Sequence, residues 1–338
     1  MMKNIFLLLL ALGLVSCNSA QSNYVSSKKM TRVDYENTIT AEDLKTHLYK
    51  FSDDSMEGRM TGEPGQKMAA EYLKTFYVAN DIKSAYNDDN YYQTIPADYF
   101  SRMKEPKSSE NVVAFIKGSE KPDEVIVLSA HYDHVGMHDG EIYNGADDDG
   151  SGNVAMLEIA EAFQKAVKDG KGPKRSILFL HVTGEEIGLF GSRYYTENPI
   201  FPLENTVCNL NTDMIGRIDP NKKENPNYIY LIGSDKLSQE LHDVSEMVNE
   251  KYINLELDYT FNDENDPNRF YYRSDHYNFA KNNIPVIFYF NGVHEDYHQP
   301  TDTADKINYE LLAKRTKLIF QTTWEIANRD GRITADKL

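Results

Sequence analysis

The stretch VIVLSAHYDHVGMHDGEIYNGADDDGSG, at residues 125–152, decides the fold class of this chain. It begins with an apolar run that is typical of a β-strand, and this run ends in the polar segment 131–134. It closes on small and acidic residues that lead into a helical stretch over residues 151–168. A strand, a polar turn and a helix in this order are typical of an α/β domain.

The same alternation continues on both sides of this stretch. Strands are expected at residues 111–116, 125–128, 177–182, 207–210, 228–232 and 284–289, and helices at 65–77, 151–168, 236–250 and 308–328. Several strands are continuous apolar runs, which indicates that both of their faces are covered. We therefore expect an α/β fold, a three-layer α/β/α sandwich with a central, mostly parallel mixed sheet.

The N-terminus has the features of an export signal. Residues 5–15 are apolar, but a membrane span needs about 20 such residues. The segment LVSC at residues 14–17 resembles a bacterial lipoprotein signal. We expect a signal peptide at 1–17, a lipid on Cys17, a flexible tether at 18–32 and a single domain at 33–338. An ordinary secretory signal with an incidental Cys17 is the alternative.

The composition limits the partners and the compartment. The chain has 53 acidic and 36 basic residues and a formal charge of −17, which argues against nucleic-acid binding. The segment after Cys17 lacks an acidic run, which favours an exported protein held on the periplasmic side of the cell envelope. We expect a monomer that touches the membrane only through its lipid. Cys208, in an apolar run, is expected to be buried and to have no chemical role.

Five polar segments follow apolar runs that are typical of strands. They are His131-Tyr-Asp133, Asn144-Gly-Ala-Asp147, Gly184-Glu-Glu186, Asn211-Thr-Asp213 and Tyr297-His298. Each has a structural explanation when taken singly, but ligands in open α/β sheets gather at the carboxyl ends of strands. Together the segments supply the ligands and the general base that a hydrolytic metal site needs.

The residue types suggest how two of these segments act. A metal-bound histidine usually donates its second ring N–H to a carboxylate or carbonyl, and Asp133 is placed to accept it from His131. His134 competes with His131, which has the better context. Glu185 and Glu186 are adjacent and diverge in direction, so that one binds a metal while the other serves as general base.

The acidic turn at 147–149 favours a bound cation. Three consecutive carboxylates repel one another unless a cation neutralises at least one of them. A calcium loop is the main alternative, but no glutamate stands at the twelfth position of a matching EF-hand loop.

These segments resemble the co-catalytic zinc peptidases, a family that includes secreted bacterial aminopeptidases, glutamate carboxypeptidases and glutaminyl cyclases. GADDDGSG at 145–152 and GEEIGLFGS at 184–192 carry most of the resemblance. EGRMTG at 57–62, RSDH at 273–276 and TDT at 301–303 extend it over most of the chain.

The resemblance implies two Zn²⁺ per chain and a role for each matched residue. His131 and Asp213 would hold one zinc, Glu186 and His298 the other, and Asp147 would bridge the two. Glu185 would be the general base. Tyr297 would donate a hydrogen bond to the developing oxyanion, unless it is only a packing residue.

The family resemblance also implies the reaction: an aminopeptidase acting on peptides with a free N-terminus. A carboxypeptidase is an alternative, with Arg217 and Arg273 as candidate clamps for the substrate carboxylate. A glutaminyl cyclase and a non-enzymatic binding module are the others, although no ligand position is lost. The aromatic loops at 86–105 and 258–275 are expected to set a preference for apolar or aromatic N-terminal residues.

Overall fold

The computed structural model describes residues 30–86 and 89–337. The expected signal peptide, Cys17 and most of the tether lie outside the described residues. Residues Thr31–Leu338 form one compact unit. Over the described ranges, none of the helices combines the length and the apolar character that crossing a membrane requires.

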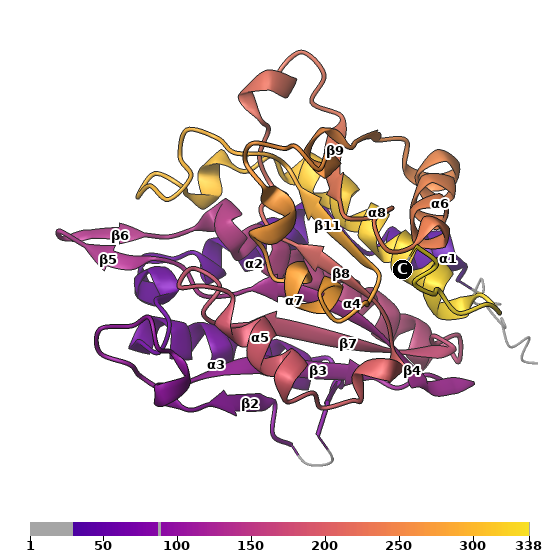
Figure 1. Cartoon of the computed structure of the whole chain (residues 1–338), viewed down its shortest axis with the longest axis horizontal. Helices are drawn as coiled ribbons and strands as arrows, with labels where there is room; N and C mark the ends of the chain where they lie inside the picture. The colour runs from indigo at the N-terminus through magenta and orange to yellow at the C-terminus, as the bar shows by residue number, and fades with distance from the viewer. Residues whose placement is uncertain (1–29, 87–88, 338) are drawn as a thin grey trace, which may run out of the picture. The chain divides into compact units, whose positions relative to one another are not determined.

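A mixed β-sheet forms the centre of this unit (Figure 1). Within the described residues it has nine strands in the order β1-β3-β7-β4-β8-β11-β9-β10, and β2 pairs with β3. The strands are β1 (Lys83–Ser84), β2 (Tyr92–Ile95), β3 (Ser109–Ile116), β4 (Lys121–His131), β7 (Arg175–Val182), β8 (Thr206–Thr212), β9 (Tyr228–Ile232), β10 (Glu256–Asp258) and β11 (Val286–Phe290). A separate hairpin joins β5 (Gly136–His138) to β6 (Glu141–Tyr143).

The four central strands are parallel. β4 runs parallel to both β7 and β8, and β8 runs parallel to β11. The sheet becomes antiparallel on both sides of this centre, where β3 pairs with β7 and β9 pairs with β11. The expected α/β fold with a mixed sheet and a parallel centre is confirmed. Its consequence is that β7, β4, β8 and β11 all end at one edge.

Helices cover both faces of the sheet. They are α1 (Arg32–Glu36), α2 (Ala41–Phe51), α3 (Pro64–Ala79), α4 (Gly152–Lys168), α5 (Phe190–Glu197), α6 (Gln239–Val248), α7 (His276–Ala280) and α8 (Tyr309–Asn328). On one face α4 and α8 contact β4 and β7, and their Phe163 and Trp324 rings stack with 5.5 Å between centroids. On the other face, Tyr195 of α5 and Phe279 of α7 pack with Val127 in one buried cluster.

The long helices and strands lie where the sequence predicts them. The reason is that the spacing of their apolar residues and the residues at their ends indicate the same bounds. For example, α8 begins after Asn308, whose side chain accepts the Leu311 N–H at 3.1 Å. The short elements were not predicted. The segment expected as a loop at 86–105 contains β2, and β1, β2 and β10 are two to four residues long. So few residues show no usable periodicity.

Candidate metal centre

The side chains predicted to bind metal or to act as the general base lie at the edge of the sheet where the parallel strands end. His131 is the last residue of β4, and Asp213 directly follows the end of β8. Glu185 and Glu186 lie in the turn after β7, and His298 lies in the loop after β11. The parallel centre of the sheet therefore brings residues from distant parts of the chain to one place.

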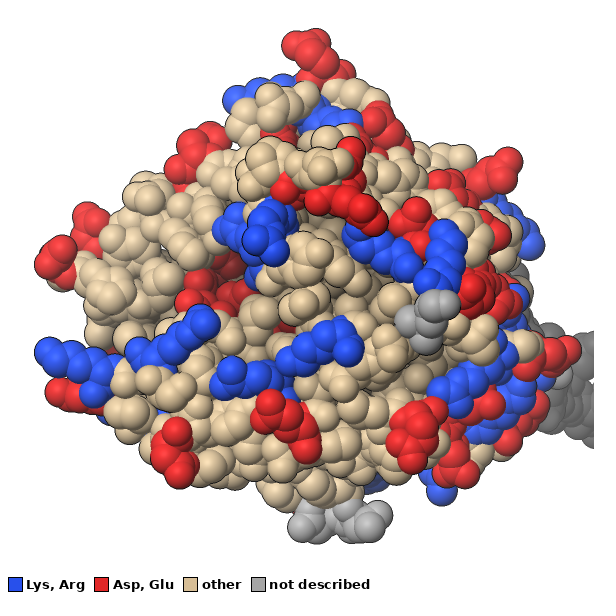
Figure 2. Space-filling view, in the orientation of Figure 1, with Lys and Arg blue, Asp and Glu red and all other residues tan. Residues whose placement is uncertain are grey.

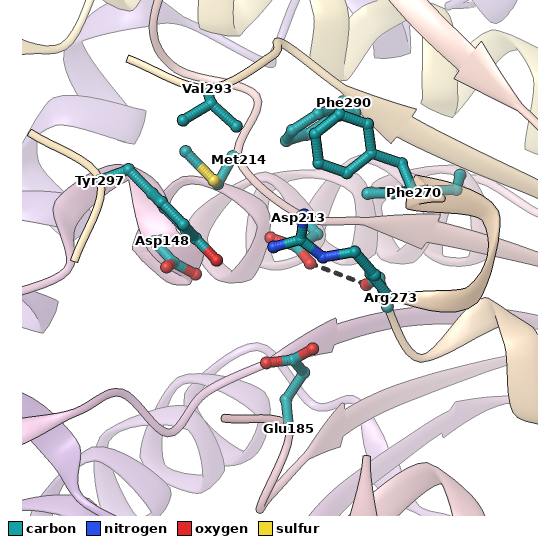
Figure 3. Close-up of a pocket in the computed structure, with 11 residues that line it drawn as sticks. Asp148, Glu185, Asp213, Met214, Phe270, Arg273, Phe290, Val293 and Tyr297 are labelled. Atoms are coloured by element: carbon teal, nitrogen blue, oxygen red, sulfur yellow. Dashed lines mark hydrogen bonds between the residues drawn. The ribbon is translucent and has the colours of Figure 1, made fainter. Parts of the chain in front are cut away.

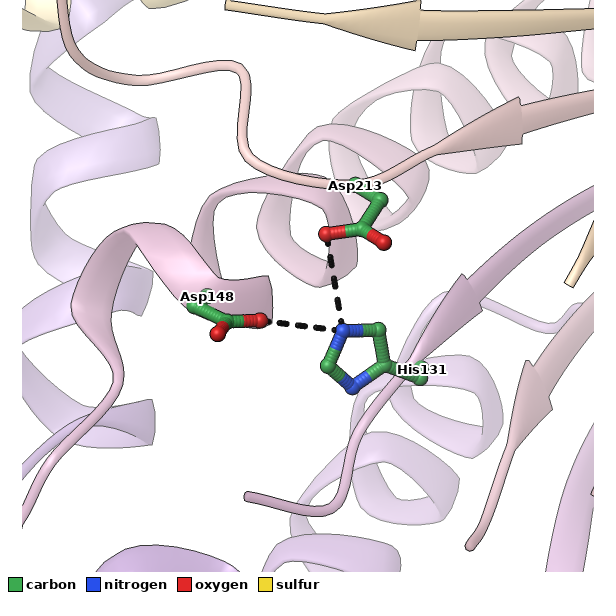
Figure 4. Close-up of side chains that lie close together, drawn as sticks. All are labelled: His131, Asp148 and Asp213. Atoms are coloured by element: carbon green, nitrogen blue, oxygen red, sulfur yellow. Dashed lines mark ion pairs between the residues drawn. The ribbon is translucent and has the colours of Figure 1, made fainter. Parts of the chain in front are cut away.

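Two groups of ligating atoms meet at the carboxylate of Asp148. His131 Nε2 lies 3.1 Å from Asp148 Oδ1 and 3.5 Å from Asp213 Oδ1 (Figure 4). His298 Nε2 lies 3.1 Å from the other oxygen, Asp148 Oδ2, and 3.0 Å from Glu186 Oε2. Asp148 thus presents one oxygen to each group.

His134 lies at this centre as well as His131, although the sequence favoured His131 alone. Its Nδ1 is 2.7 Å from Glu186 Oε1 and 3.8 Å from Asp148 Oδ2. Its side chain is buried, and neither ring nitrogen forms a hydrogen bond of good geometry with another described residue. His134 therefore belongs to the Glu186 side of the centre, while His131 belongs to the Asp213 side.

Asp147, predicted as the bridging residue, points away from both groups. Its Oδ1 accepts the Gly216 N–H at 2.7 Å, and its Oδ2 lies 3.0 Å from His294 Nε2. The side chain is fully buried in this network. The geometry corrects the prediction by one residue, because the carboxylate between the two groups is that of Asp148.

The shape of the acidic turn explains the difference between the three aspartates. The backbone of Asp148 and Asp149 leaves helical geometry, so their side chains take separate directions from that of Asp147. Asp149 Oδ1 accepts the N–H groups of Gly152 at 3.0 Å and Met214 at 3.1 Å. Of these three aspartates, Asp148 is the one whose carboxylate faces the imidazoles of His131 and His298. The sequence alone does not indicate which of three adjacent aspartates points in which direction.

The donor set fits bound cations. Two overlapping sets of three donors, each with all its ligand atoms within 4.8 Å of one another, are His131, Asp148 and Asp213, and His134, Asp148 and Glu186. Asp148 Oδ2, Glu186 Oε1 and both His134 nitrogens are buried, and within the described part of the chain none of them forms a hydrogen bond of good geometry, although imidazole nitrogens lie close to both carboxylate oxygens. Such atoms are costly unless something binds them. Imidazole nitrogens and carboxylate oxygens are ligands typical of zinc.

The charged side chains of this centre strongly shift one another's pKa. Burial raises the pKa of Asp148, but hydrogen bonding and charge from His131, His134 and His298 outweigh it and hold that pKa well below its ordinary value. Burial lowers the pKa of His298, but its contacts with Asp148 and Glu186 raise it to about 10. A metal binds only the neutral imidazole, so binding must displace this proton.

Glu185 stands beside the two groups with its carboxylate directed into a pocket (Figure 3). Burial raises the pKa of Glu185 well above its ordinary value, and the nearby carboxylates of Glu186 and Asp213 raise it further. Such a group takes up a proton more readily than an exposed glutamate, as a general base must.

Asp133 does not hold His131 in the predicted way. The ring Nδ1 of His131 lies 3.0 Å from the backbone carbonyl of Asp133, whereas the Asp133 carboxylate is 3.9 Å from it. That carboxylate accepts hydrogen bonds from Thr61 Oγ1 at 2.8 Å and from the Glu185 N–H at 3.2 Å. The carbonyl thus orients the imidazole, and the carboxylate of Asp133 instead anchors the backbone of the candidate base.

Tyr297 lies at the pocket with Asp148 and Glu185 (Figure 3). Its ring stacks on His298 with 4.0 Å between the centroids. Burial and the surrounding carboxylates raise its pKa, so its hydroxyl keeps its proton at neutral pH. Its predicted role as a hydrogen-bond donor to an oxyanion stays a prediction.

The pocket in Figure 3, here called the inner pocket, has an acidic side and an apolar side. Its lining consists of Asp148, Glu185, Asp213, Met214, Phe270, Arg273, Ser274, Phe288, Phe290, Val293 and Tyr297. The loop at 258–275 contributes three of these residues, as expected. The loop at 86–105 contributes none, and two strand residues, Phe288 and Phe290, take that place.

Several supporting residues were not predicted. The Arg59 guanidinium is fully buried and donates hydrogen bonds to the carbonyls of Tyr132, Asn144 and Gly145 at 2.9, 2.7 and 2.9 Å. It therefore ties the segment after β4 to the acidic turn. The resemblance at 57–62 pointed to this segment, but only the structure shows what its arginine holds.

Two further contacts define the edges of the centre. Ser274 Oγ donates a hydrogen bond of 2.7 Å to Asp213 Oδ2 and thereby orients that carboxylate. Arg217 forms an ion pair of 2.7 Å with Asp296 and is largely buried. It is therefore not available as the substrate clamp considered for a carboxypeptidase.

Comparison with known proteins places these features in a family. Residues 111–323 match the model of peptidase family M28. A probable zinc metalloprotease of Pyricularia oryzae is 28% identical over 274 residues, which are 69% of this chain and 53% of that protein. A probable aminopeptidase of Saccharomyces cerevisiae is 23% identical over 77% of this chain and 66% of its own length. The chain thus spans about half to two thirds of these two relatives.

Solved structures share the fold. The LapA aminopeptidase of Legionella pneumophila superposes with a TM-score of 0.67 at 20% identity, covering 95% of this chain and 81% of LapA. The zinc aminopeptidase BSAP of Bacillus subtilis superposes with a TM-score of 0.65 at 17% identity, covering 88% of this chain and 98% of BSAP. The family match spans more than half of the sequence and includes the acidic turn and the paired glutamates. The chain belongs to peptidase family M28.

Proposed function

We propose that this protein is a zinc-dependent aminopeptidase that binds two zinc ions per chain and removes residues from the free N-terminus of peptides. The observation that carries the proposal is the carboxylate of Asp148, which lies between two sets of donors with Glu185 beside it. The family match and the zinc aminopeptidases among the similar structures support it.

The proposed ligands follow the geometry. His131 and Asp213 would hold one ion, Glu186 and His298 the other, and Asp148 would bridge them in place of Asp147. Zinc bound by these residues would supply Lewis acidity, which would polarise a scissile carbonyl and lower the pKa of a water towards about 7. His134, next to Glu186, completes the buried donors on that side.

The chain's own residues perform the remaining steps. The carboxylate of Glu185 takes the proton of the attacking water and delivers it to the leaving amine. The hydroxyl of Tyr297 donates a hydrogen bond towards the developing oxyanion. The apolar side of the inner pocket, with Phe270 and Phe290, receives the side chain of the N-terminal residue. We infer a preference for large apolar residues.

The charges that line the site support action at the N-terminus of a peptide. Carboxylates line the inner pocket and attract an α-ammonium group, and Arg217 is engaged with Asp296. The glutaminyl cyclase and carboxypeptidase alternatives are not favoured.

All donors named here come from one chain, which supports a monomer as the active unit. Light scattering on a sizing column tests the monomer, and a dimer that loses activity on dilution would contradict it.

Paired peptides test the function directly. The purified protein, loaded with zinc, is incubated with Leu-Ala-Ala-Ala and with its N-acetylated form, and free leucine is measured. We expect release from the unblocked peptide only, together with close to two zinc ions per chain by elemental analysis. Cleavage of the acetylated peptide from its C-terminal end would contradict the proposal.

We further propose that the protein is exported and anchored by a lipid on Cys17, facing the periplasm. The support is the sequence of residues 5–22 alone, with its apolar run, the segment LVSC at 14–17 and no acidic run directly after Cys17. Metabolic labelling with an alkyne fatty acid should mark the wild type and not the Cys17→Ala variant, which should leave the membrane fraction. Equal membrane association of the two proteins would contradict the anchor.

A further inference from the structure

A second hollow, here called the outer pocket, opens next to the inner pocket. Glu185, Arg273 and Tyr297 line both pockets, whereas Arg102, Ile187 and Tyr272 line only the outer one. The two hollows therefore meet at the candidate general base. If the N-terminal side chain enters the inner pocket, the peptide beyond the scissile bond extends into the outer pocket.

Arg102 lies against the turn that follows the glutamate pair. Its Nη1 is 3.4 Å from the carbonyl oxygen of Ile187, and a Cβ atom on Gly188 would lie only 2.3 Å from Nη1. The absence of a side chain at position 188 thus leaves room for the guanidinium at this place. Arg102 comes from the loop at 86–105, which contributes nothing to the inner pocket.

Arg273 stands at the junction of the two pockets. Its guanidinium lies 5.0 Å from the ring centre of Phe270, and Figure 3 shows it across the inner pocket from Glu185. Both arginines are exposed. Within the described ranges, neither of them lies within 4.0 Å of a carboxylate, whereas Arg217 is paired with Asp296.

The chain has a net charge of −17, and these two guanidinium groups lie beside an acidic pocket. Figure 2 shows acidic side chains inside a hollow and Lys and Arg side chains along its rim. The acidic interior suits an ammonium group. The guanidinium groups beside it, which have no carboxylate partner among the described residues, suit an anion. Guanidinium groups bind carboxylates with two parallel hydrogen bonds, and such charge-assisted bonds are about twice as strong as neutral ones.

We propose that Arg102 and Arg273 form a subsite for a carboxylate on the leaving side of the scissile bond. This subsite rests on the proposed aminopeptidase function and narrows its substrates. The carboxylate has two sources: the α-carboxylate of a dipeptide, or the side chain of Asp or Glu at the second position of a longer peptide. The arginines bind this group and orient the leaving residue, while the inner pocket holds the N-terminal residue.

Two matched substrate pairs test the subsite in the zinc-loaded protein. Leu-Ala against Leu-Ala-amide isolates the α-carboxylate, and Leu-Asp-amide against Leu-Asn-amide isolates the side-chain carboxylate. Leucine 4-nitroanilide, which has a neutral leaving group, measures the basal activity. Each substrate is tested with the wild type, Arg102→Gln, Arg273→Gln, the double variant, and Lys104→Gln as a control from the same loop as Arg102.

We expect kcat/KM to be about tenfold higher for the carboxylate member of at least one pair, equivalent to about 1.4 kcal/mol. This preference should fall in each single variant, disappear in the double variant and persist in Lys104→Gln. Hydrolysis of leucine 4-nitroanilide should stay within about twofold in Arg102→Gln. The pair that shows the preference identifies the source of the carboxylate.

Two results would overturn the subsite: no preference in either pair, or a preference that survives in the double variant. Both can occur with full hydrolysis of leucine 4-nitroanilide, in which case the aminopeptidase function stands. Failure to hydrolyse any unblocked substrate would instead refute the function on which the subsite rests.

Discussion

Single replacements of Asp148 and of Asp147 distinguish the roles of two adjacent carboxylates, which lie in different networks of contacts. Asp148→Asn removes the charge that faces His131 Nε2 and His298 Nε2, each 3.1 Å away. Loss of a residue that merely orients a zinc ligand weakens metal binding about 10–100-fold. Loss of a residue shared by both ions should weaken metal binding by at least that factor. The zinc content should therefore fall from about two ions to below one per chain.

Asp147→Asn should affect stability and not metal content. Asp147 accepts the Gly216 N–H, and its second oxygen faces His294 Nε2 at 3.0 Å. The other nitrogen, His294 Nδ1, accepts the Asp296 N–H at 3.3 Å, so Nε2 carries the hydrogen. An amide nitrogen at position 147 would face this donor. One unsatisfied buried donor costs about 1–3 kcal/mol, equivalent to a fall in Tm of about 2–6 °C.

The assay combines three measurements on the same preparations. Zinc is counted by elemental analysis after dialysis, hydrolysis is followed with leucine 4-nitroanilide, and Tm is measured by calorimetry. We expect Asp148→Asn to lose at least about 100-fold in activity, in line with its metal loss, and Asp147→Asn to keep two zinc ions and most activity. The reverse pattern would refute the geometry and restore Asp147 as the bridge.

Three further predictions address the base, the metal and a buried acid. Glu185→Gln should keep its zinc and lose about 10²–10⁴-fold in kcat; an equally active variant would remove Glu185 from the mechanism. Removal of the metal by a chelator should lower Tm, and zinc at about 100 times its Kd should restore about 2.7 kcal/mol of stability; a Tm indifferent to zinc would contradict a folded metal site. Burial, reinforced by the charges of Glu161 and Asp43, raises the pKa of Glu158 to about 8. Because the neutral acid is favoured in the fold, the stability from Glu158 is complete below about pH 4.5 and is lost as pH rises through about 8. Glu158→Gln should therefore reduce the fall in Tm between pH 5 and 9, and an unchanged pH profile would refute the raised pKa.

The sequence was informative about the fold where its patterns were long. The strand expected at 177–182 lies within the eight-residue β7, and the stretch expected at 308–328 forms α8 at Tyr309–Asn328. Long apolar periods predict such elements because each residue adds to the same signal. Elements such as β1, with two residues, depend on pairing with a neighbour and so escaped prediction.

The sequence also located most of the candidate site. His131, Asp213, Glu186 and His298 were chosen by motif and position after strands, and the structure brings all four around one carboxylate. This was possible because parallel strands end at a common edge. Strand ends therefore report proximity even between residues far apart in the chain.

Taken by itself, the sequence determined the class of the fold, the edge of the sheet that carries chemistry, and the types of residue gathered there. Only the tertiary structure decided which of three adjacent aspartates, Asp148, faces both groups. It likewise decided that the carbonyl of Asp133 orients His131, and that Arg102 and Arg273 flank the outer pocket with no carboxylate of the described residues within 4.0 Å. Side-chain direction within a turn depends on backbone angles that distant contacts impose, and a sequence pattern does not record those contacts.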